Sequence, residues 1–370
     1  MIVALFPELM SFGGVQLAGR ELAAAASAIS RERGGRFRAL SLNDARGEHE
    51  SRVGCTWFEF RGFGRNRFRF LLAALQAARE QPKYILAAHP NLAPVAMVMK
   101  YFAGKPQVIV CTHGIEVWRP LSAIRGFSLR RADLVLAPSL DTERRAEEVQ
   151  HVANKKIHKF SWALDPDFLA HAAASENLPL PAEFPHGLTV LSVGRWNASE
   201  RYKGADLLIQ AVAELATEFR DLHLVLAGSG DDIPRLMQLS QKSGCAERIH
   251  FLENLTRGAL AACYSKADVF ALPSSGEGFG LVFLEAMAMK KPVIGANAGG
   301  IPDLVQDGEI GFLVNPKDSV SLVSALRKLL SSAELREKMG KRARETVLSR
   351  FSFENFQSEL RSILQTEDSS

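Results

Sequence analysis

The chain has 370 residues, about twice the usual length of one domain, so we expect two domains. Apolar residues make up 47% and charged residues 23%, which suits two ordinary cores and excludes a disordered or fibrous protein. The N-terminus lacks a basic region and a small-residue cleavage site, and no apolar run reaches the roughly 18 residues of a membrane span. The four cysteines are isolated and predict free thiols in a reducing compartment. We therefore expect a cytoplasmic protein.

Short apolar runs alternate with segments of helical period through the first half of the chain, as in βαβ units of a parallel sheet. The predicted strands are Ile2–Phe6, Arg38–Leu42, Tyr84–Ala88, Val108–Thr112, Leu134–Ala137 and Lys156–Phe160. The predicted helices between them are Gln16–Ser30, Arg69–Arg79 and Asn91–Tyr101. Residues 171–187 contain three prolines and little periodicity, which predicts a linker.

The same alternation restarts after the linker. The predicted strands are Leu188–Val193, Leu222–Ala227, Arg248–Leu252, Val269–Pro273 and Pro292–Gly295. The predicted helices are Ala205–Glu218, Pro234–Ser243, Thr256–Ser265, Leu281–Lys290, Val320–Leu330 and the long segment Glu334–Leu364. We therefore expect an α/β protein of two doubly wound, Rossmann-like domains facing each other across a cleft. Their expected ranges are 1–170 and 188–350, with a C-terminal helix at about 351–370 packing back on the first domain.

The most informative segment is PSSGEGFGLVFLE, residues 273–285. A strand runs into a glycine-rich loop, and a helix is expected to begin near Gly280, whose exposed amides would suit a phosphate. Glu277 precedes this helix and Glu285 lies one to two turns inside it, roughly 8–12 Å away along one edge. Two carboxylates flanking a set of amides suit the hydroxyls on either side of a diphosphate, whereas a glycine-rich turn with two solvated glutamates is the plain alternative.

A second segment, SVGRWNASERYKG, delivers two cations to the carboxyl end of a predicted strand. Arg195 follows the strand directly and Lys203 precedes the next helix. Together they could stabilise the charge of a leaving diphosphate without a metal, although two solvated loop cations remain the alternative. A weaker signal, FGGVQLAG, follows the first strand but lacks the dinucleotide-binding spacing of glycines.

These segments together resemble a known family. The pair Glu277 and Glu285, with seven residues between them, resembles the E-x7-E signature of the retaining family-four glycosyltransferases of GT-B fold. Further segments of the second half also resemble the family: GRWNASERYKGADLLI, LVLAGSGD and the block from FALPSSGEGFG to GFLVNP. In the first half, the N-terminal motifs of that family are similar to GGVQ and THGIEVW. The resemblance covers nearly the whole chain and is strongest from about 188 to 316.

The resemblance implies a role for each matching residue on the second domain. Arg195 and Lys203 match the cations that bind the donor diphosphate, although the loop between them is longer than in many members. Glu277 matches the glutamate near the donor sugar, and Glu285 matches the one that bonds the ribose hydroxyls. The loop whose amides meet sugar and phosphate corresponds to Gly278, Phe279, Gly280, Leu281 and Val282.

Three further positions follow from the resemblance. Leu255 falls where the family contacts the base, Gly14 matches a glycine facing the diphosphate, and His113 matches the residue that reaches the donor sugar. The implied catalytic set is His113, Glu277, Arg195 and Lys203. The implied reaction is retaining, metal-independent transfer of a hexosyl group from a UDP- or GDP-sugar to a hydroxyl acceptor, in polysaccharide, lipopolysaccharide or glycolipid synthesis. No cofactor is expected.

Other features leave alternatives open. Asp165-Pro166-Asp167 imitates a DxD metal motif but is interpreted as a turn, so no metal site is predicted. His89 also ends a strand and is an acceptor-side candidate. The run Phe60–Arg79 has five arginines, four phenylalanines and no acid, which fits either a solvated basic helix or a patch that meets an anionic membrane or a lipid-linked acceptor. Nucleic acid is not an expected partner, because no recognised binding module accompanies the patch.

Rival functions on the same architecture are a sugar-nucleotide epimerase, a phosphorylase and a non-catalytic nucleotide-sugar-binding protein. The E-x7-E segment argues against the first two, and no lysine for pyridoxal phosphate is identified. The third has no distinguishing sequence feature, because binding and catalytic residues coincide.

Overall fold

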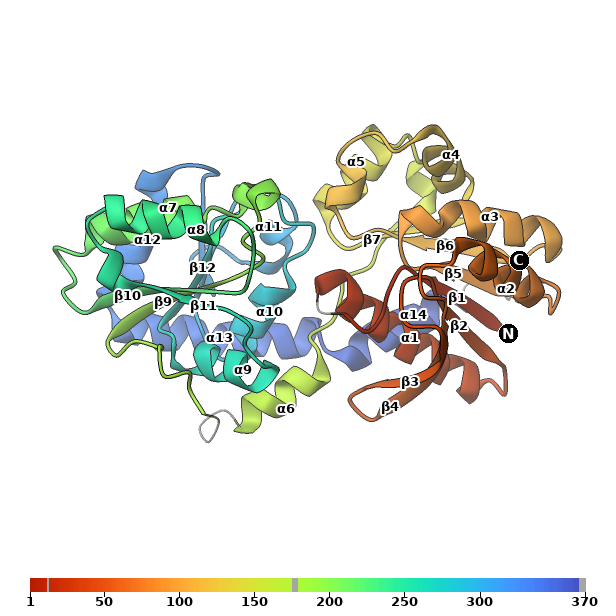
Figure 1. Ribbon diagram of the computed structural model, residues 1–370, viewed down its shortest axis with the longest axis horizontal. Coiled ribbons are helices and arrows are strands. Elements are labelled where there is room, and N and C mark those ends of the chain that lie inside the picture. The colour runs from red at the N-terminus through yellow and green to blue at the C-terminus, as the bar shows by residue number, and fades with distance from the viewer. Residues whose placement is uncertain (12, 175–178, 366–370) are drawn as a thin grey trace. The chain divides into compact units, whose positions relative to one another are not determined.

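The structure is a computed structural model that describes residues 1–11, 13–174 and 179–365 (Figure 1). The chain forms two compact units, one of Met1–Pro166 with the segment from Ser352, the other of Asp167–Phe351. The predicted linker, 171–187, thus falls within the second unit, and its residues 175–178 lie outside the described part, as do residues 366–370 of the predicted C-terminal helix. None of the described helices is long and apolar enough to span a membrane.

The first unit contains, among its described residues, an eight-stranded sheet in the order β3-β4-β2-β1-β5-β6-β7-β8. Its strands are β1 (Ile2–Phe6), β2 (Phe37–Ser41), β3 (Gly47–Val53), β4 (Thr56–Gly62), β5 (Tyr84–Ala87), β6 (Gln107–Cys111), β7 (Leu134–Ala137) and β8 (Ile157–Lys159). Neighbouring strands are parallel except for the hairpin of β3 and β4. Helices cover both faces, so the central strand β1 is buried along its whole length, as its unbroken apolar run predicts.

The helices of this unit are α1 (Gly14–Glu32), α2 (Arg67–Ala78), α3 (Ala93–Phe102), α4 (Ala123–Arg131), α5 (Leu140–Glu148) and α14 (Phe353–Ile363). The C-terminal helix α14 lies beside α1, where Arg361 pairs with Glu32 at 2.8 Å (Figure 1). The ring of Phe356 packs against Phe160, with centroids 4.7 Å apart. The last helix of the chain is therefore part of the core of the first unit.

The second unit contains, in the described residues, a six-stranded parallel sheet in the order β11-β10-β9-β12-β13-β14. Its strands are β9 (Leu188–Val193), β10 (Leu222–Ala227), β11 (Ile249–Leu252), β12 (Val269–Leu272), β13 (Val293–Ala296) and β14 (Gly311–Val314). Its helices are α6 (Pro166–Ala174), α7 (Ala205–Leu215), α8 (Ile233–Lys242), α9 (Arg257–Lys266), α10 (Leu281–Ala288), α11 (Ile301–Leu304), α12 (Ser319–Leu330) and α13 (Ala333–Arg350). Figure 1 shows α7, α8 and α12 on one face of this sheet and α9, α10 and α13 on the other.

Each predicted strand is present to within a residue at each end, and the two-sheet α/β architecture is confirmed. The sequence analysis did not predict the hairpin of β3 and β4, whose residues alternate between exposed and buried because only one face of it is covered. It also did not predict β14. The prediction of continuous helix over Glu334–Leu364 is wrong, because α13 ends at Arg350 and Ser352 caps the separate helix α14 by accepting from the amide of Asn355 at 3.2 Å.

Candidate functional site

The sheet of the second unit has a switch point between β9 and β12. From β9 the chain proceeds to β10 and β11 on one side, whereas from β12 it proceeds to β13 and β14 on the other. The loops that follow β9 and β12 therefore diverge and leave a crevice at the carboxyl edge, the usual ligand site of such sheets. These loops, residues 194–204 and 273–280, are the two segments that the sequence marked as chemically informative.

An ion pair joins the two loops. Nζ of Lys203 lies 2.9 Å from Oε1 of Glu277, and both side chains are nearly buried, at 11% and 13% exposure. The backbones also touch, since the amide of Ser275 donates to the carbonyl of Tyr202 at 2.9 Å. Gly204 adopts φ +80°, and a Cβ there would lie 2.9 Å from the carbonyl oxygen of Pro273. Only a glycine thus allows the approach that brings Lys203 to Glu277.

A second cation stands at the outer end of this cluster. Arg195 is 68% exposed and pairs with Glu200 at 3.0 Å, while the other oxygen of Glu200 lies 3.6 Å from Nζ of Lys203. Burial and the carboxylates of Glu277 and Glu200 raise the pKa of Tyr202 well above its ordinary value. Two cations and two carboxylates thus alternate along the crevice, and each carboxylate orients a cation.

The loop of residues 277–282 packs against two adjacent glycines, Gly299 and Gly300. The amide of Gly300 donates to the carbonyl of Glu277 at 2.8 Å, and a Cβ on Gly299 would lie 2.3 Å from that same oxygen. Gly280, at φ +101°, precedes α10, so the amides of the first helical turn start from the loop. The remaining predicted loop positions are Gly278 and Phe279, both buried, and Leu281 and Val282, both half-buried. The segment has the form of an anion site at a helix N-terminus.

Glu285 lies one turn inside α10. Its Oε2 accepts a hydrogen bond of 2.9 Å from the hydroxyl of Tyr264, a residue of α9 that the sequence analysis did not single out. Burial and the charge of Glu285 raise the pKa of Tyr264 well above its ordinary value, so the hydroxyl remains a donor at neutral pH. Leu255 is half-buried in the loop that follows β11 at the same edge of the sheet.

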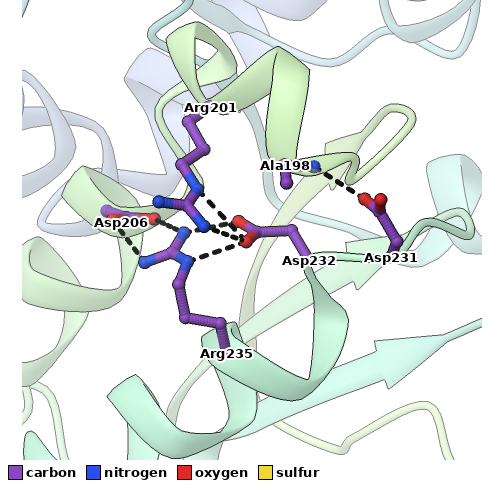
Figure 2. Close-up of polar contacts among 6 residues, drawn as sticks. All are labelled: Ala198, Arg201, Asp206, Asp231, Asp232 and Arg235. Atoms are coloured by element: carbon purple, nitrogen blue, oxygen red, sulfur yellow. Dashed lines mark hydrogen bonds and ion pairs between the residues drawn. The ribbon is translucent and has the colours of Figure 1, made fainter.

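A network of arginines and aspartates supports the loop that carries Lys203. Figure 2 shows Asp232, which precedes α8, between Arg201 and Arg235 at 2.9 and 2.5 Å, and Arg235 also pairs with Asp206 of α7 at 2.7 Å. Hydrogen bonds from Arg235 and Arg201 lower the pKa of Asp232 despite its burial. The motifs of the sequence did not point to these residues, although two adjacent acids precede a helix in GSGDD.

The first unit has its own switch point, between β1 and β5. Asp44 fixes the loop after β1 by accepting from the amides of Leu9 and Met10 at 2.7 and 3.1 Å. Gly14 begins α1 directly after this loop, and Phe12 of the predicted glycine motif lies outside the described residues.

His113 follows β6, the strand beside β5, and belongs to a stack of rings. Its ring lies 5.0 Å from that of Trp162 with 11° between the planes, and 5.7 Å from that of His89. Its Nε2 lies 2.7 Å from the carbonyl oxygen of Ala88, which can only accept, so Nε2 carries the proton and Nδ1 is an acceptor. Burial and the neighbouring His113 lower the pKa of His89 to about 4, so His89 is neutral at physiological pH.

The structure also places the motif Asp165-Pro166-Asp167 and the basic run Phe60–Arg79. Asp165 is buried and Pro166 begins α6, and the described residues contain no group of three or more His, Cys, Asp or Glu side chains arranged to hold a metal. In the run Phe60–Arg79, three phenylalanines are buried and Phe68 is 71% exposed. The interleaved phenylalanines therefore belong mainly to the core and are not available to enter a membrane interface.

Comparison with known proteins matches both halves of the chain to family models. Residues 12–168 match the model described as Glycosyltransferase Family 4, and residues 182–346 match Glycosyl transferases group 1. The two matches together leave only short stretches of the chain uncovered.

Similar proteins include the D-inositol 3-phosphate glycosyltransferase of Corynebacterium diphtheriae, 35% identical over 161 residues, which are 42% of this chain and 37% of that protein. The GDP-mannose-dependent alpha-(1-6)-phosphatidylinositol monomannoside mannosyltransferase of Mycolicibacterium smegmatis is 29% identical over 69% of this chain and 70% of its own length. The matches span only 37%, 58% and 54% of the first three curated relatives.

Among solved structures, Anabaena Alr3699/HepE in complex with UDP superposes with a TM-score of 0.80 at 19% identity, over 99% of both chains. The same protein has been solved with UDP-glucose. At this identity the similarity shows the fold.

Proposed function

Because this chain belongs to the family-four glycosyltransferases of GT-B fold, we propose that it transfers a hexosyl group from a nucleotide-diphosphate sugar to a hydroxyl acceptor, with retention at the anomeric carbon. The observation that carries the proposal is the Lys203–Glu277 pair at the switch point of the second sheet. It brings together a cation suited to the leaving diphosphate and a carboxylate suited to sugar hydroxyls.

In the proposed reaction the donor diphosphate lies against the amides that begin α10, with Arg195 and Lys203 beside it. Negative charge grows on the diphosphate as its bond to the sugar breaks, and cations already fixed in place stabilise that charge without rearrangement. Glu277 would bond the sugar hydroxyls and Glu285 the ribose hydroxyls. The Tyr264 hydroxyl, which donates to Glu285, would fix the orientation of that carboxylate toward the ribose.

His113 and Gly14 supply the contribution of the first unit in this proposal. The ring of His113, with Nε2–H held by the carbonyl of Ala88, would present its Nδ1 side to a hydroxyl of the donor sugar. Its stack against Trp162 keeps the ring in one orientation, which a positioned acceptor requires.

The proposed donors are UDP-sugars and GDP-sugars. One relative is named as GDP-mannose-dependent and one structural neighbour holds UDP-glucose, which supports both choices. The proposed acceptors are growing polysaccharides, lipopolysaccharides or glycolipids, and the relatives include proteins named for lipid acceptors. The proposed location is cytoplasmic, with or without peripheral membrane contact.

The test is release of nucleoside diphosphate from a panel of UDP-glucose, UDP-N-acetylglucosamine and GDP-mannose, with and without candidate acceptors. We expect one donor to turn over, faster with its acceptor, and the product to keep the anomeric configuration by proton NMR. Donor binding without any turnover would indicate a non-catalytic nucleotide-sugar-binding protein. An epimerised nucleotide sugar would indicate the epimerase alternative.

A further inference from the structure

A cavity of about 250 Å³ opens on the first unit at the end of β4, lined mainly by residues of the run Phe60–Arg79. It is bounded by the end of that strand, by the segment that precedes β3, and by one side of helix α2. Its lining residues are Arg46, Arg61, Gly62, Phe63, Arg69, Leu72, Ala73 and Gln76. Since β4 is parallel to β2, its end lies at the carboxyl edge of the sheet, where ligands of such folds bind.

Three guanidinium groups reach this cavity from three different elements. Arg46 precedes β3, Arg61 belongs to β4, and Arg69 belongs to α2. Within the described residues, the guanidinium groups of Arg46 and Arg69 have no hydrogen bond or ion pair. Arg61 pairs with Glu48 at 3.4 Å, a contact between two exposed side chains, so its charge is only partly balanced. The cavity thus collects a surplus of positive charge.

Helix α2 adds to that surplus. Asn66 caps it by accepting from the amide of Arg69 at 3.0 Å, and the first turn holds Arg67 and Arg69 with no acid. Local electrostatics favours acidic residues there, because the helix dipole already places partial positive charge at this end. An anion bound beside these arginines would explain why the sequence has them at the positive end of a helix.

Apart from Gln76, the remaining side chains of the cavity wall are apolar. Phe63 is 5% exposed and packs edge-on against Phe70 at 5.4 Å, while Arg61 lies over its ring at 5.6 Å. Leu72 is 45% exposed on the facing side of α2. The volume is below that of most pockets for whole ligands, about 300–1,000 Å³, so it suits one charged group with a short apolar or sugar attachment.

We propose that Arg46, Arg61 and Arg69 form a binding site for a phosphate ester, and that this ester is carried by the acceptor. Planar guanidinium groups match phosphate oxygens by paired hydrogen bonds, which favours a phosphate over a carboxylate when three converge. The acceptor role rests on the proposed function. Only β2 separates β4 from β1, so the site lies about 10 Å along the sheet from the strand that leads to Gly14.

The experiment measures binding of glycerol 3-phosphate and inorganic phosphate to the full chain by phosphorus NMR. A parallel arm measures flotation with vesicles of phosphatidylglycerol and phosphatidylcholine against phosphatidylcholine alone. The cavity variant is Arg46→Glu with Arg69→Glu. The matched control is Arg79→Glu with Arg131→Glu, which makes the same change of charge at exposed arginines of this unit that neither line the cavity nor lie in the first turn of α2.

We expect the cavity variant to bind glycerol 3-phosphate at least about tenfold more weakly, and the control to stay within about twofold of wild type. Vesicle binding with the same ranking of variants would identify a lipid headgroup as the source of the phosphate. Binding of the soluble esters alone would identify a soluble phosphorylated acceptor. If wild type binds neither probe, or if the control loses binding equally, the proposal is overturned.

Two further measurements separate folding and the proposed function from this site. The milder variant Arg46→Gln with Arg69→Gln, checked for an unchanged melting temperature, must show the same loss of binding. Donor-induced stabilisation against heat should be unaltered in the cavity variants, because none of the proposed donor residues lines the cavity. A wild type that binds the phosphate ester but turns over no donor would refute the proposed function and leave the phosphate site standing.

Discussion

The carboxyl edges of the two sheets are built from different chemistry. At the edge of the second sheet, two cations and two carboxylates alternate, with Lys203 and Glu277 nearly buried and in contact. At the edge of the first sheet, around β5 and β6, the rings of His89, His113 and Trp162 form a stack in which His89 is neutral at physiological pH. One edge presents charges held in ion pairs, and the other presents stacked rings, with Glu116 accepting from the amide of His113.

The difference indicates a division of labour within the proposed reaction. A departing diphosphate needs fixed positive charge, which is effective where water is limited and the cations do not have to move. A sugar needs acceptors that do not attract the diphosphate, and a neutral histidine satisfies that requirement.

The largest effect is expected at Lys203. Replacement by Met removes the cation beside Glu277, and we expect turnover at saturating donor to fall about 10²–10³-fold. Arg195→Met should cost about tenfold, because that side chain is 68% exposed and its charge is screened. Steady-state kinetics with donor titration measures both values. A higher KM with unchanged turnover would show that Lys203 contributes only to ground-state binding.

The control for Lys203→Met is the free energy of unfolding of the variant. Lys203→Met leaves a nearly buried carboxylate without its closest cation, which we expect to lower the free energy of unfolding by about 3 kcal/mol. Adding Glu277→Gln should recover most of that loss without restoring turnover. If the double variant regains turnover, the pair is structural.

A smaller effect is expected at Glu285. Glu285→Ala should weaken donor binding by about 1–3 kcal/mol, the scale of lost hydrogen bonds to a charged group. Tyr264→Phe, which removes only the hydroxyl that donates to Glu285, should weaken it by about 1 kcal/mol. Titration calorimetry measures both changes. Unchanged affinity in a folded Glu285→Ala protein would remove Glu285 from the donor site.

The neutrality of the first edge predicts a pH dependence of stability. The pKa of His89 is about 4 in the folded chain against an ordinary value of 6.5, so between these values only the unfolded chain binds the proton. Its contribution to stability is therefore complete above pH 6.5 and is lost as pH falls toward 4. By pH 5 we expect a loss of about 2 kcal/mol, measured by denaturant unfolding.

The comparison variant for this pH effect is His89→Asn, which keeps a side-chain acceptor for the amide of Asn91 and removes the titrating ring. It should lose less stability between pH 7 and pH 5 than wild type. His151→Asn, a change at an exposed histidine, should behave like wild type. Equal slopes for wild type and His89→Asn would show that the first edge is not held neutral through His89.

Removal of metal ions is expected to have no effect on turnover. If Arg195 and Lys203 replace a metal at the second edge, EDTA should leave turnover unchanged, measured as nucleoside diphosphate release. Loss of activity in EDTA that magnesium or manganese restores would break the contrast, because the positive charge at that edge would then come from an ion.

The sequence by itself predicted much of this protein, because several of its signals are local. The central strand β1 is an unbroken apolar run, so it could be located to the residue. The loops after β9 and β12 could be predicted because glycines and charged residues follow both strands. Loops that follow parallel strands lie at the same edge of the sheet. The hairpin of β3 and β4 escaped prediction because an edge with one covered face gives a weaker pattern.

Only the tertiary structure decided which side chains meet. Lys203 and Glu277 are 74 residues apart, and their contact depends on β9 and β12 being neighbours, which no local pattern specifies. Likewise Trp162 stacks on His113, and Arg46 joins Arg61 and Arg69, because the order of strands in the sheet places their loops together. Local sequence sets backbone conformation within a few residues, whereas strand order is set by the burial of all the apolar faces at once.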